Sequence, residues 1–116
     1  MKKKTICFDI DEVICRSPKN NYFKSIPIKK NIKKINQLYN QGYVIKIFTA
    51  RFMGTTNDDI KKAEKLAKKI TIKSLKKWGV RYHSIFFGKP AYDIFIDDKS
   101  IFFDKNWVLK INKYLK

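Results

Sequence analysis

Four short apolar runs are spaced along the chain, and each is followed by polar residues. These runs cover residues 4–10, 43–49, 84–87 and 92–96. They are rich in β-branched and aromatic side chains and have the length of strands, whereas a membrane-spanning helix needs about 20 apolar residues. The pattern predicts four buried strands whose carboxyl ends present polar groups.

Helical periodicity fills most of the remaining chain. Apolar residues repeat at helical spacing over 28–41 and over 58–78, where eight lysines lie mostly on the opposite side. Residues 107–115 predict a final amphipathic helix, and residues 12–27 predict a loop or a small hairpin flap. The alternation of strand, helix and strand is typical of parallel crossover units.

The length and composition fit a single domain that covers residues 1–116. We expect an α/β fold, a single Rossmann-like three-layer domain with a mostly parallel sheet flanked by helices. The N-terminal residues run into an acidic strand end and do not form a signal-peptide pattern, and Cys7 and Cys15 have no metal-binding spacing. The sequence therefore predicts a cytoplasmic protein with two free thiols and no membrane partner.

Reactive side chains follow each predicted strand. They are Asp9 and Asp11, then Thr49, then Lys89, then Asp97 and Asp98. The carboxyl ends of parallel strands lie along one edge of a sheet, so residues distant in sequence converge there. Asp9 and Asp11 are two positions apart on one strand and face a common point. We expect one cleft that contains all six groups.

Several carboxylates in one cleft would repel one another unless cations neutralised them. Mg²⁺, a hard cation that prefers oxygen ligands, would do so and leave coordination positions for a substrate phosphate. Lys89 would balance the charge on Asp9 and then the charge on a transferring phosphoryl group. Thr49 adds a hydroxyl that can donate to a phosphate oxygen. The sequence thus predicts phosphate chemistry at this edge.

Four short motifs carry a resemblance to a known family. They are FDIDEV (8–13), FTAR (48–51), GKP (88–90) and IDD (96–98), each at a predicted strand end. In this order they resemble the motifs of phosphatases in the haloacid dehalogenase superfamily. One such motif is a weak signal, whereas four in order are a specific one.

The resemblance implies a magnesium-dependent phosphomonoester hydrolase that works through an aspartyl-phosphate intermediate. Asp9 would attack phosphorus, and Asp11 would protonate the leaving oxygen and then activate water. Mg²⁺ would be held by Asp9, by the backbone carbonyl of Asp11 and by Asp97. Asp98 would bind the metal through water or orient Lys89.

Three further residues, Ala50, Arg51 and His83, are expected to contact the substrate. For Arg51 the alternative is a surface ion pair. For His83, the single histidine, the alternative is a packing role beside Trp78 and Tyr82.

The sequence departs from the family pattern at one visible position. The family commonly has glycine after the second aspartate, and this chain has Glu12 followed by Val13. Glycine serves a turn there that a side chain would strain. The departure therefore predicts a strained turn next to an otherwise complete set of reactive groups.

The resemblance also bears on the cap and on the substrate. Many relatives carry a cap domain after the first or second motif, but residues 12–27 and 52–57 are too few to fold as one, so the chain resembles the capless type. An open site takes a large substrate, or a neighbouring subunit of a homo-oligomer covers it. Residues 35–51 and 76–98 are similar to small phosphatases of capsule and surface-polysaccharide synthesis. That similarity implies a phosphorylated sugar or a sugar-derived small metabolite.

A formal charge of +17 leaves a second class of function open. Such a field attracts nucleic acid, and a nucleic-acid-binding module or a phosphatase of nucleic-acid ends is the alternative. The aromatic residues lie within strand patterns and not between lysines, which favours a solvated lysine face and no nucleic-acid partner. Steep loss of binding with salt would separate the two.

Overall fold

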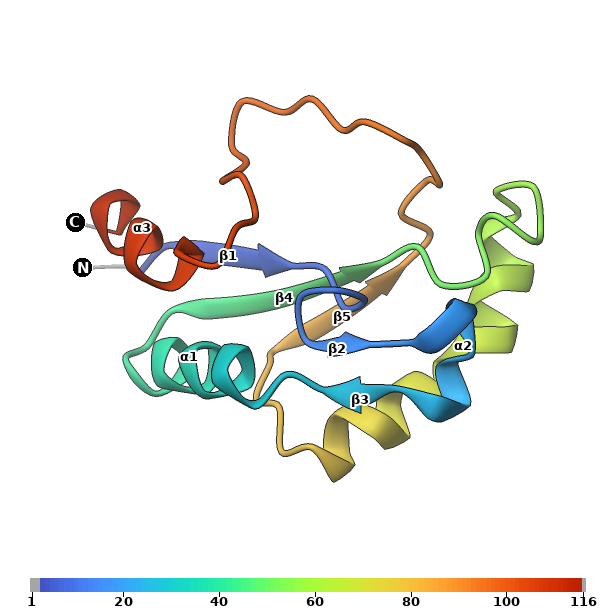
Figure 1. Ribbon diagram of the computed structural model, residues 1–116, viewed down its shortest axis with the longest axis horizontal. Coiled ribbons are helices and arrows are strands. Elements are labelled where there is room, and N and C mark those ends of the chain that lie inside the picture. The colour runs from blue at the N-terminus through green and yellow to red at the C-terminus, as the bar shows by residue number, and fades with distance from the viewer. Residues whose placement is uncertain (1–2, 116) are drawn as a thin grey trace.

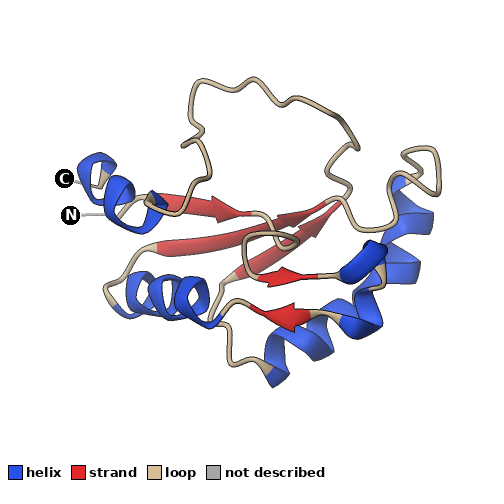
Figure 2. Cartoon of the chain, in the orientation of Figure 1, coloured by secondary structure: helices blue, strands red, loops and turns tan. Residues whose placement is uncertain are grey.

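The computed structural model describes residues 3–115 and has a parallel three-stranded sheet at its centre (Figures 1 and 2). The strands are β1 (Thr5–Phe8), β4 (Val44–Thr49) and β5 (Ser84–Phe87), in the order β1-β4-β5. Ile47 of β4 is level with Phe8 on one side and with Ile85 on the other. This register confirms three of the expected strands and brings their carboxyl ends to one edge.

Helices α1 (Lys29–Asn40) and α2 (Ile60–Lys77) confirm the two expected long helices. The Asp59 carboxylate accepts the Lys62 N–H at 3.1 Å and caps the start of α2. Gly42 and Gly79 follow the two helices with positive φ angles of 96° and 68°, which glycine adopts without strain.

A single core lies between these helices and the sheet. It includes residues of β4, α1, α2 and the turn after β1, among them Ile10, Ile14, Ile35, Leu38, Ile45, Ile47 and Leu75. Helix α3 (Trp107–Tyr114) joins this core through Trp107, whose ring meets Phe8 at a centroid distance of 5.7 Å. The Trp107 indole N–H donates to the buried Asn31 side chain at 3.1 Å, and Asn31 donates to the Val13 carbonyl. Asn31 thus ties α3 to α1 and to the turn after β1.

The expected flap is present as a short hairpin. Strands β2 (Cys15–Arg16) and β3 (Ile26–Pro27) pair antiparallel, and two 3₁₀ turns, η1 (Pro18–Asn20) and η2 (Tyr22–Lys24), connect them. We call residues 12–27 the hairpin. Within residues 3–115 no cap domain is present, and no described helix has the length and apolarity to cross a membrane.

The expected fourth strand, 92–96, is wrong. Residues 88–106 form a long loop on the β1 side of the sheet (Figure 1), in which Ile94 and Ile96 are 80% and 93% exposed. The rings of Tyr92 and Phe95 stack on each other and each lies 5.4 Å from the Lys89 ammonium. The aromatic side chains therefore gather around Lys89 and do not alternate across a sheet.

Replacing Trp107 with phenylalanine tests the tie through Asn31. Trp107→Phe keeps the ring in the core but leaves the buried Asn31 oxygen without its donor, and we expect a loss of about 1–3 kcal/mol of unfolding free energy. Chemical denaturation measures it. Trp78→Phe is the control, because among residues 3–115 the Trp78 indole donates no hydrogen bond. Equal losses in both variants would mean that the bond to Asn31 adds nothing.

Candidate active site

The carboxyl edge of the sheet brings together residues from three strands. Asp9 follows β1, Thr49 ends β4, and Lys89 follows β5. The Lys89 N–H donates to the Thr49 carbonyl at 3.1 Å, which extends the pairing of β4 and β5 beyond the strands. The Lys89 ammonium in turn lies 3.6 Å from an Asp9 carboxylate oxygen. The structure therefore assembles three of the expected residues at one place.

Asp9 is a half-buried carboxylate with one well-made hydrogen bond. Its Oδ1 accepts the Ile10 N–H at 2.8 Å, and its Oδ2 faces Lys89. Burial raises the pKa of Asp9, and the charge on Asp11 raises it further, while Lys89 and the Ile10 N–H act in the opposite direction. With 35% of its side chain exposed, Asp9 is open to an incoming ligand. A desolvated, accessible carboxylate is suited to act as a nucleophile.

Lys89 is more enclosed than Asp9, with 14% of its side chain exposed. Burial lowers the pKa of Lys89, but the Tyr92 side chain and the Asp9 carboxylate outweigh burial and raise it above its ordinary value. Lys89 therefore stays charged at neutral pH and can offset negative charge beside Asp9.

Asp11 lies next to Asp9 but is held by a different cation. The Arg51 guanidinium binds it through both carboxylate oxygens, at 3.0 Å from Nε to Oδ2 and 3.1 Å from Nη2 to Oδ1. The Ser17 hydroxyl donates to Oδ1 at 2.7 Å, and the Cys15 thiol lies 3.6 Å from the same atom. Both oxygens of Asp11 are thus already occupied.

Arg51 lies inside the protein and is only 1% exposed. Its remaining contacts are with the Thr71 hydroxyl, the Ser25 hydroxyl, the Cys15 sulfur and the face of the Tyr22 ring. Neither expectation for Arg51 holds in this structure, since the pair with Asp11 is buried and the guanidinium does not face a substrate. The ion pair is an interior one and not a surface one.

Thr49 and Ala50 end β4 beside this pair. The buried Thr49 hydroxyl accepts the Arg51 backbone N–H at 3.1 Å, which leaves its own proton for another acceptor. Ala50 is half-buried, and its carbonyl accepts the Met53 N–H. Thr49 is joined to Lys89 through its backbone carbonyl, and a role of Thr49 and Ala50 toward a ligand stays a prediction.

His83 lies at the opposite end of β4. Its Nδ1 accepts the Ile45 N–H at 2.9 Å, and the His83 backbone N–H donates to the Ile45 carbonyl. The His83 ring stacks on the Tyr39 ring at a centroid distance of 4.5 Å. The Arg81 guanidinium lies over the same Tyr39 ring. The expected substrate contact by His83 is not supported, and its packing partner is Tyr39.

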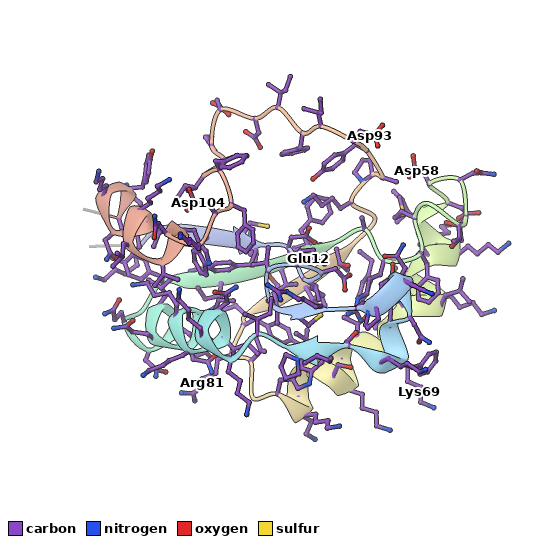
Figure 3. All side chains as sticks on the ribbon, in the orientation of Figure 1. Glu12, Asp58, Lys69, Arg81, Asp93 and Asp104 are labelled. Carbon is purple, nitrogen blue, oxygen red and sulfur yellow. The ribbon has the colours of Figure 1, made fainter. Side chains whose placement is uncertain are left out.

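Asp97 and Asp98 are not brought to Asp9. Both lie in the exposed loop that also carries Asp93 and Asp104 (labelled in Figure 3). Asp97 accepts the Lys99 N–H at 3.0 Å, and this bond lowers the pKa of Asp97. Because no fourth strand forms, nothing aligns these two carboxylates with the strand ends.

The fit of these residues to Mg²⁺ is therefore incomplete. Within residues 3–115 no group of three acidic, histidine or cysteine side chains is arranged to hold a metal. The Asp9 carboxylate is an oxygen ligand of the right kind, and the expected ligand from Asp11 is its backbone carbonyl, which the contact between the Asp11 carboxylate and Arg51 leaves available. Of the four expected aspartates, Asp9 and Asp11 lie next to each other, and Asp97 and Asp98 would have to approach them from the exposed loop to complete the set.

The network around Arg51 was not predicted from the sequence. Its members outside the four motifs are Cys15, Ser17, Tyr22, Ser25 and Thr71. One signal was available: the chain has 27 basic residues, of which three are arginines. Arginine holds a carboxylate through two bonds where lysine offers a point charge, as Arg51 does with Asp11.

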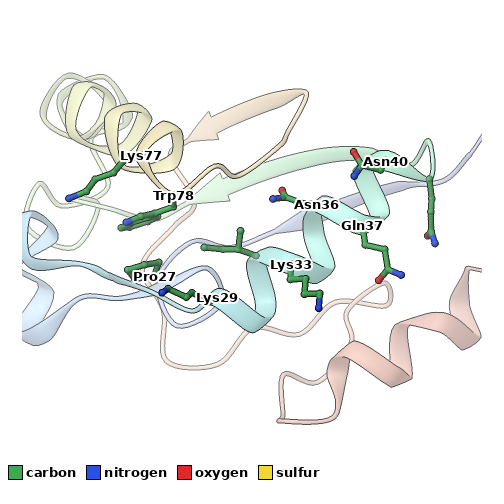
Figure 4. Close-up of a pocket in the computed structure, with 10 residues that line it drawn as sticks. Pro27, Lys29, Lys33, Asn36, Gln37, Asn40, Lys77 and Trp78 are labelled. Atoms are coloured by element: carbon green, nitrogen blue, oxygen red, sulfur yellow. The ribbon is translucent and has the colours of Figure 1, made fainter.

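One cavity lies away from this edge of the sheet. It has a volume of about 810 Å³ and lies between α1 and the end of α2, with Lys33, Asn36 and Trp78 among its lining residues (Figure 4). None of the four motifs contributes to its lining. Asn36 is already bonded to the Gly79 carbonyl and to the Arg81 N–H, so its amide serves the fold.

No protein-family model and no curated protein match this chain. Solved structures do match it. An MCSG target from Vibrio cholerae superposes with a TM-score of 0.80 at 23% identity, over 97% of this chain and 99% of that one. The fold is thus shared over nearly all of both chains.

Two other matches are a named enzyme and a named assembly. D,D-heptose 1,7-bisphosphate phosphatase from B. bronchiseptica, crystallised with magnesium and phosphate, has a TM-score of 0.52 at 16% identity, over 78% of this chain and 52% of that one. The Pnkp1/Rnl/Hen1 RNA repair complex matches with a TM-score of 0.55 at 16% identity. The match covers 94% of this chain and 30% of that one. At these identities the matches show a shared fold.

Glu12 occupies a left-handed backbone position, with φ at 74°. Glu12→Gly should raise the unfolding free energy by about 0.5–1 kcal/mol, because glycine adopts this conformation without the strain of a β-carbon. Glu12→Ala is the control, since it also removes the exposed 4.0 Å contact with Arg16 but keeps the strain. Equal stabilisation by both variants would assign the effect to charge and not to the backbone.

The pKa of Asp9 depends on Lys89. Because Lys89 is the largest influence that lowers this pKa, Lys89→Gln should raise the pKa of Asp9 above its already raised value. A ¹³C NMR titration of the Asp9 carboxyl carbon measures this. Lys46→Gln, on the exposed side of β4, should leave the titration unchanged. A lower pKa in Lys89→Gln would contradict the pairing of Lys89 with Asp9.

Proposed function

We propose that this chain is a phosphatase that hydrolyses a small phosphomonoester through an aspartyl-phosphate on Asp9. The observation that carries the proposal is the accessible, partly desolvated Asp9 carboxylate paired with Lys89 at the carboxyl edge of the sheet. The fold shared with a heptose bisphosphate phosphatase supports the same reaction class.

The proposed reaction has two steps. An Asp9 oxygen attacks phosphorus, the bond from phosphorus to the substrate oxygen breaks, and that oxygen takes a proton from Asp11. Water then attacks the phosphorus of aspartyl-phosphate, gives a proton to Asp11, and releases phosphate and the Asp9 carboxylate. Lys89 and the Thr49 hydroxyl stabilise the charge on the transferring group. Asp11 must give up part of its contact with Arg51 during this cycle.

Magnesium dependence is part of the proposal. Bound Mg²⁺ would neutralise charge on the phosphoryl oxygens. The heptose phosphatase was crystallised with magnesium and phosphate, which supports such a requirement here. The proposed ligands are Asp9, the Asp11 carbonyl, Asp97 and Asp98, and the last two would have to approach Asp9 from their exposed loop.

We propose a sugar phosphate or a sugar-derived metabolite as the substrate, with a cytoplasmic role in capsule or surface-polysaccharide synthesis. The named substrate of the heptose phosphatase is itself a sugar bisphosphate. The absence of a cap within residues 3–115 leaves Asp9 open, and a second copy of the chain would be one way to cover it.

A second candidate is the processing of nucleic-acid ends. The match to an RNA repair complex favours it, as does the lysine-rich exposed side of α2, which includes Lys61, Lys65, Lys68 and Lys69. Substrate affinity that falls steeply with salt would support this candidate. Salt-tolerant turnover of sugar phosphates would count against it.

Phosphate release tests the proposed function. The assay uses an aryl phosphate and a panel of sugar and nucleoside phosphates, with Mg²⁺ or chelator. We expect magnesium-dependent turnover that falls at least about a thousandfold in Asp9→Asn, because the variant lacks the nucleophile. Asp104→Asn, in the distant pair with Lys110, should retain activity. No turnover on any substrate, or turnover indifferent to Asp9→Asn, would overturn the proposal.

A further inference from the structure

The two aspartates of the first motif are held by different cations. Asp9 faces Lys89 across 3.6 Å and has 35% of its side chain exposed. Asp11 faces Arg51 across 3.0 Å, and the arginine side chain is fully buried. Only one of the two cations can therefore reach a ligand in the open site.

The contacts of Arg51 leave it nothing to offer a substrate. Its Nε and Nη2 bind Asp11, its Nη1 donates to Thr71 at 3.2 Å, and Nη2 also reaches Ser25 and Cys15. The Tyr22 ring covers one face of the guanidinium, and the Arg51 Cζ lies 4.5 Å from the centroid of that ring. Every edge and one face of this group are already in contact with protein.

These contacts also connect Asp11 to the hairpin. Cys15, Tyr22 and Ser25 belong to the hairpin and all touch Arg51. Ser17, also in the hairpin, donates to Asp11 at 2.7 Å and lies 2.7 Å from the Ser25 hydroxyl. A change in the position of the hairpin would therefore change the position of Asp11.

We propose that Arg51 is a positioning residue, which orients Asp11 as the acid and base of the reaction and links that orientation to the hairpin, without touching the substrate. The inference rests on the proposed phosphatase function. It assigns Arg51 a role different from the substrate contact expected from sequence. Lysine could keep the charge but not the two parallel bonds, because it lacks a planar fork.

The proposal has a kinetic signature that general damage to the fold would not produce. A leaving group of low pKa departs without a proton, whereas an alkoxide needs the acid. Mispositioning of Asp11 should therefore slow the phosphorylation step for alkyl phosphates and spare aryl phosphates. The ratio kcat/KM reports this step, because it covers events up to the first irreversible one.

The experiment compares kcat/KM for p-nitrophenyl phosphate and for a sugar phosphate with an alkyl leaving group. The variants are Arg51→Lys, Asp11→Asn, the double variant, and Arg81→Lys as a matched control. Arg81 binds Asn40 and covers Tyr39, at the other end of β4 from Asp11. Circular dichroism and thermal unfolding accompany each variant.

We expect Arg51→Lys to lower kcat/KM for the alkyl phosphate by about 10–100-fold and for the aryl phosphate by less than about threefold, since general acid catalysis is worth about 10²–10⁴-fold. Asp11→Asn should show the same selectivity. The double variant should be no slower than Asp11→Asn, because the two residues act as one unit. Arg81→Lys should leave kcat/KM unchanged for both substrates.

Equal losses on both substrates, no loss in Arg51→Lys, or additive losses in the double variant would overturn the inference. If Arg51→Lys does not fold, Ser25→Ala replaces it, because it removes one hairpin contact and no charge. Ser25→Ala should then lower kcat/KM for the alkyl phosphate by about threefold and for the aryl phosphate by less. If Ser25→Ala shows no such selectivity, the inference is overturned. Failure of the proposed function is distinct, because wild type itself would then turn over neither substrate.

Discussion

The buried contact between Arg51 and Asp11 holds the candidate site together. It joins the ends of β1 and β4, the hairpin and α2 through one guanidinium, whose partners include Ser25 and Thr71. Removal of one partner from a buried ion pair typically costs about 3–5 kcal/mol, because the other charge is left without compensation. The geometry around Asp11 is therefore fixed by the same contacts that stabilise the domain.

Asp9 is held less firmly than Asp11. It is half-exposed and faces a lysine at a longer distance, and burial raises its pKa. The result is one aspartate that is restrained and one that is accessible, two positions apart at the same strand end. The basic surface of the protein, with a formal charge of +17, would attract a phosphorylated ligand to this edge.

Local features of the sequence predicted the two long helices and the strand ends that carry Asp9 and Lys89. Apolar periodicity with Gly42, Asp59 and Gly79 placed the two long helices, and the motif spacing placed Asp9 and Lys89 at one edge. The signal for a strand at 92–96 failed because its aromatic residues pack around Lys89, a contact between side chains that no periodicity reveals. The burial of Arg51 depends on side chains from the hairpin and α2, which converge only in three dimensions.

The central claim is a covalent phosphoryl group on Asp9, and chemical trapping tests it directly. Enzyme quenched during turnover is reduced with borohydride, which converts an aspartyl-phosphate to homoserine, and the peptide that contains residues 5–15 is sequenced by mass spectrometry. The account predicts homoserine at position 9, dependent on substrate and missing from Asp9→Asn. Homoserine at position 11, or none at either position in an enzyme that releases phosphate, would contradict it.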